Sequence, residues 1–201
     1  MTMCGIVGIV NYTKDLSKDN YIIENMNDTL SKRGPDENGY FIENSVLLGH
    51  KRLIVIDPKG GKQPMSFKIN NTTYTIVYNG QIYNSNELMQ ELIEAGFEFD
   101  GYSDTEVLLK GFVHWGKNVL TKLNGIFSFA IWNNSTKELF LARDHFGIKP
   151  LYYTLVNSNF IFSSEIKAIL KHPEVSTIVD SSGLCELIGL GPAHTPRHIS
   201  F

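Results

Sequence analysis

Cys4 is the residue of this chain best placed for nucleophilic chemistry, because it lies near the amino terminus and precedes an apolar stretch. A terminal cysteine can be activated by its own α-amino group, whose pKa of about 7.7–8.0 lies near cellular pH. The alternative is a small cysteine buried on a core strand. The position of Cys4 alone leaves both interpretations open.

Asn79 and Gly80 follow an apolar run and are candidates for an oxyanion hole. The Asn79 side chain offers an amide donor, and a glycine lets a backbone N–H approach a substrate closely. Asn-Gly is also the commonest pair in two-residue hairpin turns. Taken alone, the pair favours the turn.

Arg52 and Asp104 could bind the two charged ends of an amino acid. Arg52 lies in an otherwise apolar strand, where a guanidinium needs a fixed carboxylate to bind in bidentate fashion. Asp104 lies in the first turn of a predicted helix, where the helix dipole favours a carboxylate and the side chain would project from the helix end. Singly, each is better explained as a surface ion or a cap. Together they describe a pocket for a zwitterion.

Many strands and a few helices must position these residues, which predicts an α+β layered domain. Capping patterns predict two helix starts, at Asn84 with Glu87 and at Ser103 with Glu106. The predicted helices cover residues 17–30, 84–96, 103–115 and 164–171. The predicted strands cover residues 6–10, 39–42, 46–56, 73–79, 127–132, 139–142, 151–155 and 159–162.

The composition is that of an ordinary soluble globular protein, with 201 residues, 42% hydrophobic and 19% charged. A net charge of -3 without a basic stripe argues against nucleic acid and anionic lipid as partners. The absence of a long apolar run argues against a membrane protein. Two cysteines are too few for a disulfide-stapled fold, so we expect a cytoplasmic protein.

A series of short motifs occurs in one order along the chain. They are CGIVG at 4–8, RGPD at 33–36, GHKRL at 49–53, QP at 63–64, YNGQIYN at 78–84, SDTE at 103–106, RDHFGIKPLY at 143–152 and SEIKA at 164–168. This set resembles the class II glutamine amidotransferase domain of glutamine-hydrolysing asparagine synthases. The late motifs resemble those synthases more than the amidotransferases of purine or glucosamine synthesis.

The resemblance implies an N-terminal nucleophile hydrolase fold, a four-layer αββα sandwich. Cys4 would attack the side-chain amide of glutamine, and the resulting thioester would be cleaved by water. Asn79 and Gly80 would stabilise the oxyanion, while Arg52 would hold the α-carboxylate and Asp104 the α-ammonium of the substrate. The other residues that the resemblance places beside glutamine are Leu53, Ile54, Val55, Ile56 and Gln81.

The resemblance also implies a division into domains. Residues 4–180 would form the glutaminase domain, and residues 181–201 would begin the linker to a missing ATP-dependent synthetase domain, which would make an acyl-adenylate of aspartate. No metal or cofactor is expected in the glutaminase domain, whereas ATP and Mg are expected in the synthetase domain. A homodimer is possible. Cys185, in the second segment, is interpreted as core packing.

Two features depart from the family pattern. Met1, Thr2 and Met3 precede the nucleophile, so we expect translation to start at Met3 and leave Cys4 terminal. Gln81 stands where the family commonly has glutamate, and the missing charge predicts glutamine binding weaker by about 1–2 kcal/mol. Two alternatives remain: a catalytically silent scaffold with a blocked terminus, and an amidotransferase domain that serves an acceptor other than aspartate.

Overall fold

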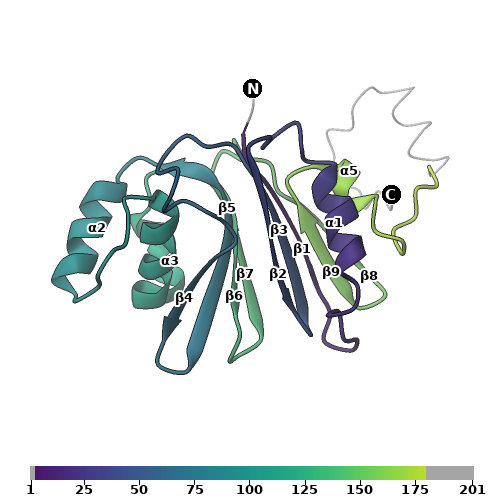
Figure 1. Ribbon diagram of the computed structural model, residues 1–201, viewed down its shortest axis with the longest axis horizontal. Coiled ribbons are helices and arrows are strands. Elements are labelled where there is room, and N and C mark those ends of the chain that lie inside the picture. Colours follow the sequence, from purple (N-terminus) through teal and green to yellow (C-terminus); the bar gives the residue numbers. More distant parts are fainter. Residues whose placement is uncertain (1–2, 180–201) are drawn as a thin grey trace.

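The computed structural model describes residues 3–179, whose strands form two antiparallel sheets that face each other (Figure 1). The first sheet has the order β2-β3-β1-β9-β8 and contains β1 Gly5–Val10, β2 Glu37–Glu43, β3 Val46–Arg52, β8 Tyr152–Val156 and β9 Asn159–Ser163. The second has the order β4-β5-β6-β7 and contains β4 Met65–Ile69, β5 Thr72–Ile82, β6 Gly125–Asn133 and β7 Glu138–Arg143.

Helices cover the outer face of each sheet, which makes the layer order helix, sheet, sheet, helix (Figure 1). The first sheet carries α1 Asn20–Asp28 and α5 Ile166–Ile169. The second carries α2 Ser85–Glu94 and α3 Asp104–Trp115, followed by the 3-10 turn η1 Gly116–Asn118 and by α4 Val119–Lys122. The predicted four-layer αββα sandwich of α+β class is confirmed.

Strand alternation fills the three apolar layers of this sandwich. Between the sheets, Ile6 and Leu48 of the first sheet pack with Val77 and Trp132 of the second. On the other face of β5, Ile76 joins the cluster under α2 and α3. Because successive side chains of β5 point to opposite sides, one strand contributes to both cores.

Several predicted boundaries were wrong for reasons that lie in tertiary contacts. The predicted strand 46–56 ends at Arg52, where the chain turns away into a loop that includes Asp57 at φ 45°. The predicted strand 73–79 continues to Ile82, and it pairs with β6 from Tyr74 to Ile82. The helix predicted at 164–171 is confined to α5, because Ser164 still bonds to β1 through Ile6.

Other elements differ in extent. The helix predicted at 17–30 is nine residues long, and β4 was not predicted. Among the described residues, no helix has the length and hydropathy needed to cross a membrane. The predicted linker segment 181–201, including Cys185, lies outside the described residues.

Candidate active site

A cavity of about 240 Å³ brings together most of the residues that the sequence singled out. The predicted site residues that line it are Cys4, Arg52, Leu53, Val55, Ile56, Asn79, Gly80, Gln81 and Asp104. Ile54 does not line it; its backbone N–H donates to Asp36 Oδ2 at 2.8 Å. Residues from both sheets and from the start of α3 therefore share one small cavity.

Cys4 lies immediately before β1, where Gly5 pairs with Lys51 of β3. Its Sγ contacts the backbone of Leu53, at 3.4 Å from the N–H and 3.6 Å from the carbonyl oxygen. Burial raises the pKa of the Cys4 thiol above its ordinary value, and the Leu53 N–H, Arg52 and Lys149 oppose that rise. The thiol is therefore neutral near pH 7 and needs a base to become a nucleophile.

Asn79 and Gly80 lie within β5, where they pair with Ser128 and Phe127 of β6. The hairpin-turn alternative is therefore wrong, because a continuous ladder passes through both residues. Asn79 is buried, and its Nδ2 has no hydrogen-bond partner within the described part of the chain. A Cβ on Gly80 would lie 2.5 Å from the carbonyl oxygen of Ile126, so only glycine fits this position.

Asp104 opens α3 as predicted, and its side chain, expected to project from the helix end, is buried. The helix start packs against β5, and Asp104 Oδ2 accepts hydrogen bonds from the Tyr78 hydroxyl at 2.7 Å and the Ile82 N–H at 3.1 Å. Burial raises the pKa of the Asp104 carboxyl, and these two donors oppose the rise. The predicted cap holds, since Ser103 accepts from the Thr105 N–H at 3.2 Å.

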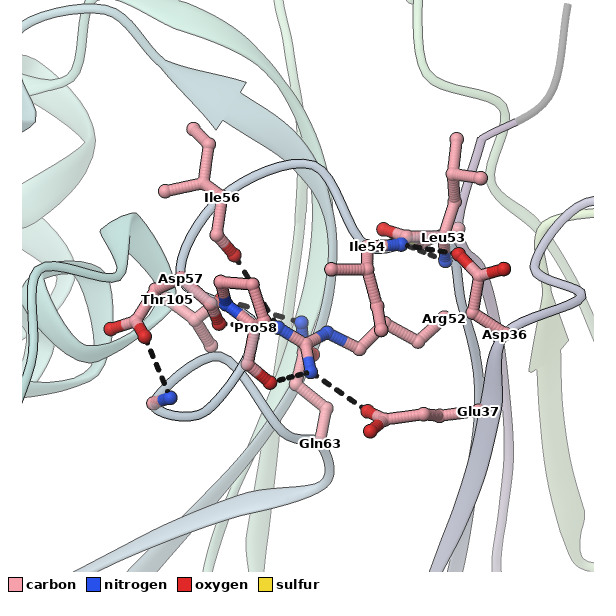
Figure 2. A network of polar contacts seen from close by, with 12 residues as sticks. Asp36, Glu37, Arg52, Leu53, Ile54, Ile56, Asp57, Pro58, Gln63 and Thr105 are labelled. Atoms are coloured by element: carbon pink, nitrogen blue, oxygen red, sulfur yellow. Dashed lines mark hydrogen bonds and ion pairs between the residues drawn. The ribbon is translucent and has the colours of Figure 1, made fainter.

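Arg52 is 4% exposed and holds the loop that follows β3 (Figure 2). Its Nη1 donates to Glu37 Oε2 at 2.7 Å and to the Pro58 carbonyl at 3.0 Å. Its Nη2 donates to the carbonyls of Asp57 at 2.6 Å and Ile56 at 3.3 Å. The guanidinium thus brings positive charge to the cavity, but a direct bidentate contact with a substrate carboxylate requires exchange of a loop carbonyl.

Lys149 also lines the cavity, although sequence reasoning gave it no role. Its backbone N–H donates to Asp144 Oδ2 at 3.0 Å, and its Nζ lies 2.9 Å from Met3 Sδ. Burial lowers the pKa of the Lys149 ammonium, with Arg33 acting in the same direction. The available signal was a basic residue inside the recognised motif at 143–152.

Gln63 is a second residue that sequence reasoning missed. Its Oε1 accepts from the Tyr78 N–H at 2.6 Å, and its Nε2 donates to Thr105 Oγ1 at 3.3 Å. One side chain therefore joins β5, next to Asn79, to the first turn of α3. Its only sequence signal was its place in the short Gln-Pro motif.

The comparisons with known proteins agree with this geometry. The glutamine amidotransferase domain family matches residues 3–200. Glutamine-hydrolyzing asparagine synthetase 3 of Bacillus subtilis is 50% identical over 194 residues, covering 96% of this chain and 32% of that protein. Glutamine-hydrolyzing asparagine synthetase 1 of the same organism is 44% identical over 170 residues, covering 84% of this chain and 27% of that protein. The chain thus spans about a third or less of these relatives.

More distant similarities concern the fold and the breadth of the family. The amidase chyE of Penicillium rubens is 35% identical over 166 residues, covering 80% of this chain and 24% of that protein. The solved structure of the allosteric regulatory enzyme of purine biosynthesis superposes with a TM-score of 0.72 at 23% identity, covering 84% of this chain and 43% of that chain. Glutamine PRPP amidotransferase of B. subtilis gives a TM-score of 0.70 at 24% identity, covering 83% and 43%. These two structures support the fold alone.

The family match extends over almost the whole chain and begins one residue before Cys4. The resemblance inferred from the ordered motifs is therefore confirmed: the chain belongs to the glutamine amidotransferase domain family, as the domain that it shares with the glutamine-hydrolyzing asparagine synthetases.

Proposed function

We propose that this domain hydrolyses L-glutamine to L-glutamate and ammonia with Cys4 as the nucleophile. The observation that carries the proposal is the shared cavity. The Cys4 thiol, the Asn79 side chain, whose Nδ2 has no partner within residues 3–179, and the opposite charges of Arg52 and Asp104 all border one space of about 240 Å³. That volume lies below the roughly 300–1,000 Å³ typical of drug-sized ligands, so it suits a small amino acid.

The reaction proceeds in two steps. The Cys4 thiol gives its proton to the free α-amine of Cys4, which acts as the base, and the sulfur bonds to the amide carbon of glutamine. The carbonyl electron pair moves to oxygen, where the Asn79 amide and the Gly80 backbone N–H stabilise it. The carbon–nitrogen bond then breaks, and ammonia leaves with a proton supplied by the amine of Cys4. Water adds to the thioester, the carbon–sulfur bond breaks, and glutamate and the thiol are released.

The two charged residues orient the substrate. Asp104 accepts the α-ammonium, and Arg52 binds the α-carboxylate by exchanging its weakest partner, the Ile56 carbonyl at 3.3 Å. The backbone of Leu53, Val55 and Ile56 borders the substrate on the Arg52 side. Gln81, which is exposed at the cavity, accepts from the ammonium without adding charge.

The proposed base requires Cys4 to be the terminal residue. In the described chain Cys4 is bonded to Met3, whose N–H donates to the Arg33 carbonyl at 3.1 Å. We infer that the active form begins at Cys4, whether through translation from Met3 and removal of that methionine or through further trimming. Intact-mass measurement of natively expressed protein tests this inference, and a mass that retains Met1 or Thr2 contradicts it.

The ammonia is destined for ATP-dependent amidation of aspartate to asparagine in a further, synthetase domain. The 50% identity with a B. subtilis asparagine synthetase supports this acceptor, and the length of that relative supports a further domain. ATP and Mg act in that domain, and the glutaminase domain needs no cofactor. A cytoplasmic location and a homodimer remain predictions.

Glutamate release from glutamine tests the proposal, using protein whose mass shows Cys4 at the terminus. The Cys4→Ala variant is expected to lose release entirely, because no other nucleophile replaces the thiol. The Cys185→Ala variant, which removes the other cysteine, is the matched control and is expected to keep full activity. No Cys4-dependent release would instead favour the catalytically silent scaffold.

A further inference from the structure

Asp57 connects two loops that each lead to residues lining the cavity. It is 5% exposed, in the loop between β3 and β4, and its side chain accepts two backbone hydrogen bonds. Oδ1 accepts from the Gly60 N–H at 2.8 Å, within its own loop. Oδ2 accepts from the Tyr102 N–H at 3.0 Å, in the segment that leads into α3. One carboxylate therefore ties together two segments that are far apart in the sequence.

The first of these segments is bound to Arg52, and the second leads into Asp104. The Asp57 carbonyl accepts from Arg52 Nη2 at 2.6 Å, so the backbone of Asp57 is fixed to the guanidinium (Figure 2). Tyr102 is followed by Ser103 and Asp104, which both line the cavity. A shift of Asp57 would therefore change the separation between Arg52 and Asp104.

Two glycines pack closely against the Asp57 carboxylate. A Cβ on Gly60 would lie 2.3 Å from Asp57 Oδ2, and a Cβ on Gly101 would lie at the same distance. The Gly60 N–H is the main cause that lowers the pKa of this carboxyl, and the Tyr102 N–H and Arg52 act in the same direction. The group is ionised at neutral pH, and both of its oxygens serve as acceptors.

We propose that Asp57 is a positioning residue for glutamine, which holds the Arg52 side and the Asp104 side of the cavity at the separation that a zwitterionic amino acid needs. The proposal rests on the proposed function, since it assigns Arg52 and Asp104 to the two ends of glutamine. Asp57 does not line the cavity and acts only through these neighbours.

The Asp57→Asn variant tests the proposal, because it keeps the size of the side chain and tolerates the left-handed φ of 45°. An amide has one acceptor oxygen, so either the Tyr102 or the Gly60 N–H loses its partner. The KM for glutamine is expected to rise about tenfold while kcat stays within about twofold, the signature of lost substrate binding. Asp15→Asn is the control, since Asp15 accepts from the Ser17 N–H at 2.9 Å at an exposed site beyond the other end of β1.

Calorimetric titration of glutamine into Cys4→Ala protein separates this inference from the proposed function, because it needs no turnover. The added Asp57→Asn change is expected to weaken the Kd about tenfold. If the Kd weakens as expected but the protein shows no Cys4-dependent turnover, the proposed function is contradicted and the role of Asp57 in glutamine binding stands. An unchanged Kd, a lower kcat at unchanged KM, or no glutamine binding by the Cys4→Ala protein overturns the role of Asp57.

A second variant keeps the test decisive if Asp57→Asn does not fold. Gly101→Ala places a methyl group 2.3 Å from Asp57 Oδ2. It therefore disturbs the hydrogen bond between Asp57 and the Tyr102 N–H from the segment that leads into α3. It is expected to raise KM and Kd in the same direction as Asp57→Asn. Unchanged values of both in folded Gly101→Ala protein overturn the proposal.

Discussion

The amide nitrogen of Asn79 is a buried donor without a partner among the described residues, and such a donor costs about 1–3 kcal/mol. This cost is offset if the donor points to where an oxyanion develops. Asn79→Ala is therefore expected to lower kcat for glutamine hydrolysis by about 10²–10³-fold with little change in KM. Steady-state glutamate release measures both constants.

Two further variants control this prediction. Asn79→Asp keeps the shape of the side chain but removes the N–H donor, so it should lose as much kcat as the alanine variant. Asn84→Ala removes an amide that bonds to the Lys122 carbonyl and the Asn124 N–H outside the cavity, and should leave kcat unchanged. A fully active Asn79→Asp enzyme would exclude Asn79 as an oxyanion donor.

The missing charge of Gln81 predicts how one substitution will change glutamine binding. Gln81→Glu adds a negative charge at the cavity, where the substrate ammonium is proposed to lie. A charge-assisted bond replaces a neutral one, so KM for glutamine is expected to fall about tenfold. Gln90→Glu, an equal charge change at an exposed position of α2, is the control. Equal KM values for the two variants would contradict the prediction.

At the scale of the element, the start of α3 decides where Asp104 lies. The cap formed by Ser103 fixes the first turn, and Glu106 fixes the preceding loop by accepting from the backbone N–H groups of Asp100 and Gly101. The predicted capping box is therefore only half present, because the Glu106 side chain serves the loop and Lys110 instead of the cap residue.

Ser103→Ala is expected to lower the free energy of unfolding by about 1 kcal/mol, because the Thr105 N–H loses its acceptor at a buried helix end. Urea denaturation measures this change. Ser31→Ala removes an exposed hydroxyl that donates to the Asp28 carbonyl after α1, and should change stability by less than about 0.5 kcal/mol. Equal changes in the free energy of unfolding for the two substitutions would show that the Ser103 cap does not stabilise the fold.

At the scale of the whole molecule, His50 bridges the two sheets. It lies on β3, is 0% exposed, and its Nε2 donates to the Tyr78 carbonyl of β5 at 3.1 Å, since a carbonyl can only accept. Burial lowers the pKa of His50 from 6.5 to about 4. The imidazole is therefore neutral in the folded protein near pH 7. Between pH 6.5 and about 4 it stays neutral in the folded protein, whereas His50 of the unfolded chain is already protonated.

This pKa difference predicts the acid sensitivity of the sandwich. Between pH 6.5 and about 4 the unfolded chain binds more protons at His50, so stability falls as pH falls through this window. The contribution amounts to about 2 kcal/mol between pH 7 and pH 5. Urea unfolding at pH 7 and at pH 5 should show that His50→Gln reduces the loss of unfolding free energy between the two pH values by this amount. His145→Gln, at an exposed position, should not reduce it, and an undiminished loss in His50→Gln would contradict the assignment.

The sequence by itself determined the family, the α+β class and the α3 cap, because each depends on neighbouring residues or on short motifs in order. It also selected Cys4, Asn79, Arg52 and Asp104, which the structure brings to one cavity. The motif order was sufficient for this, since such motifs preserve the chemistry of a site without describing its contacts.

Only the tertiary structure decided how these residues are held. It placed Asn79 inside a paired strand instead of a turn, buried Asp104 against Tyr78, and joined Asp57 to Tyr102 across 45 positions of sequence. The physical reason is that a hydrogen bond between distant segments depends on how sheets and loops pack, and local residue spacing carries no record of that packing.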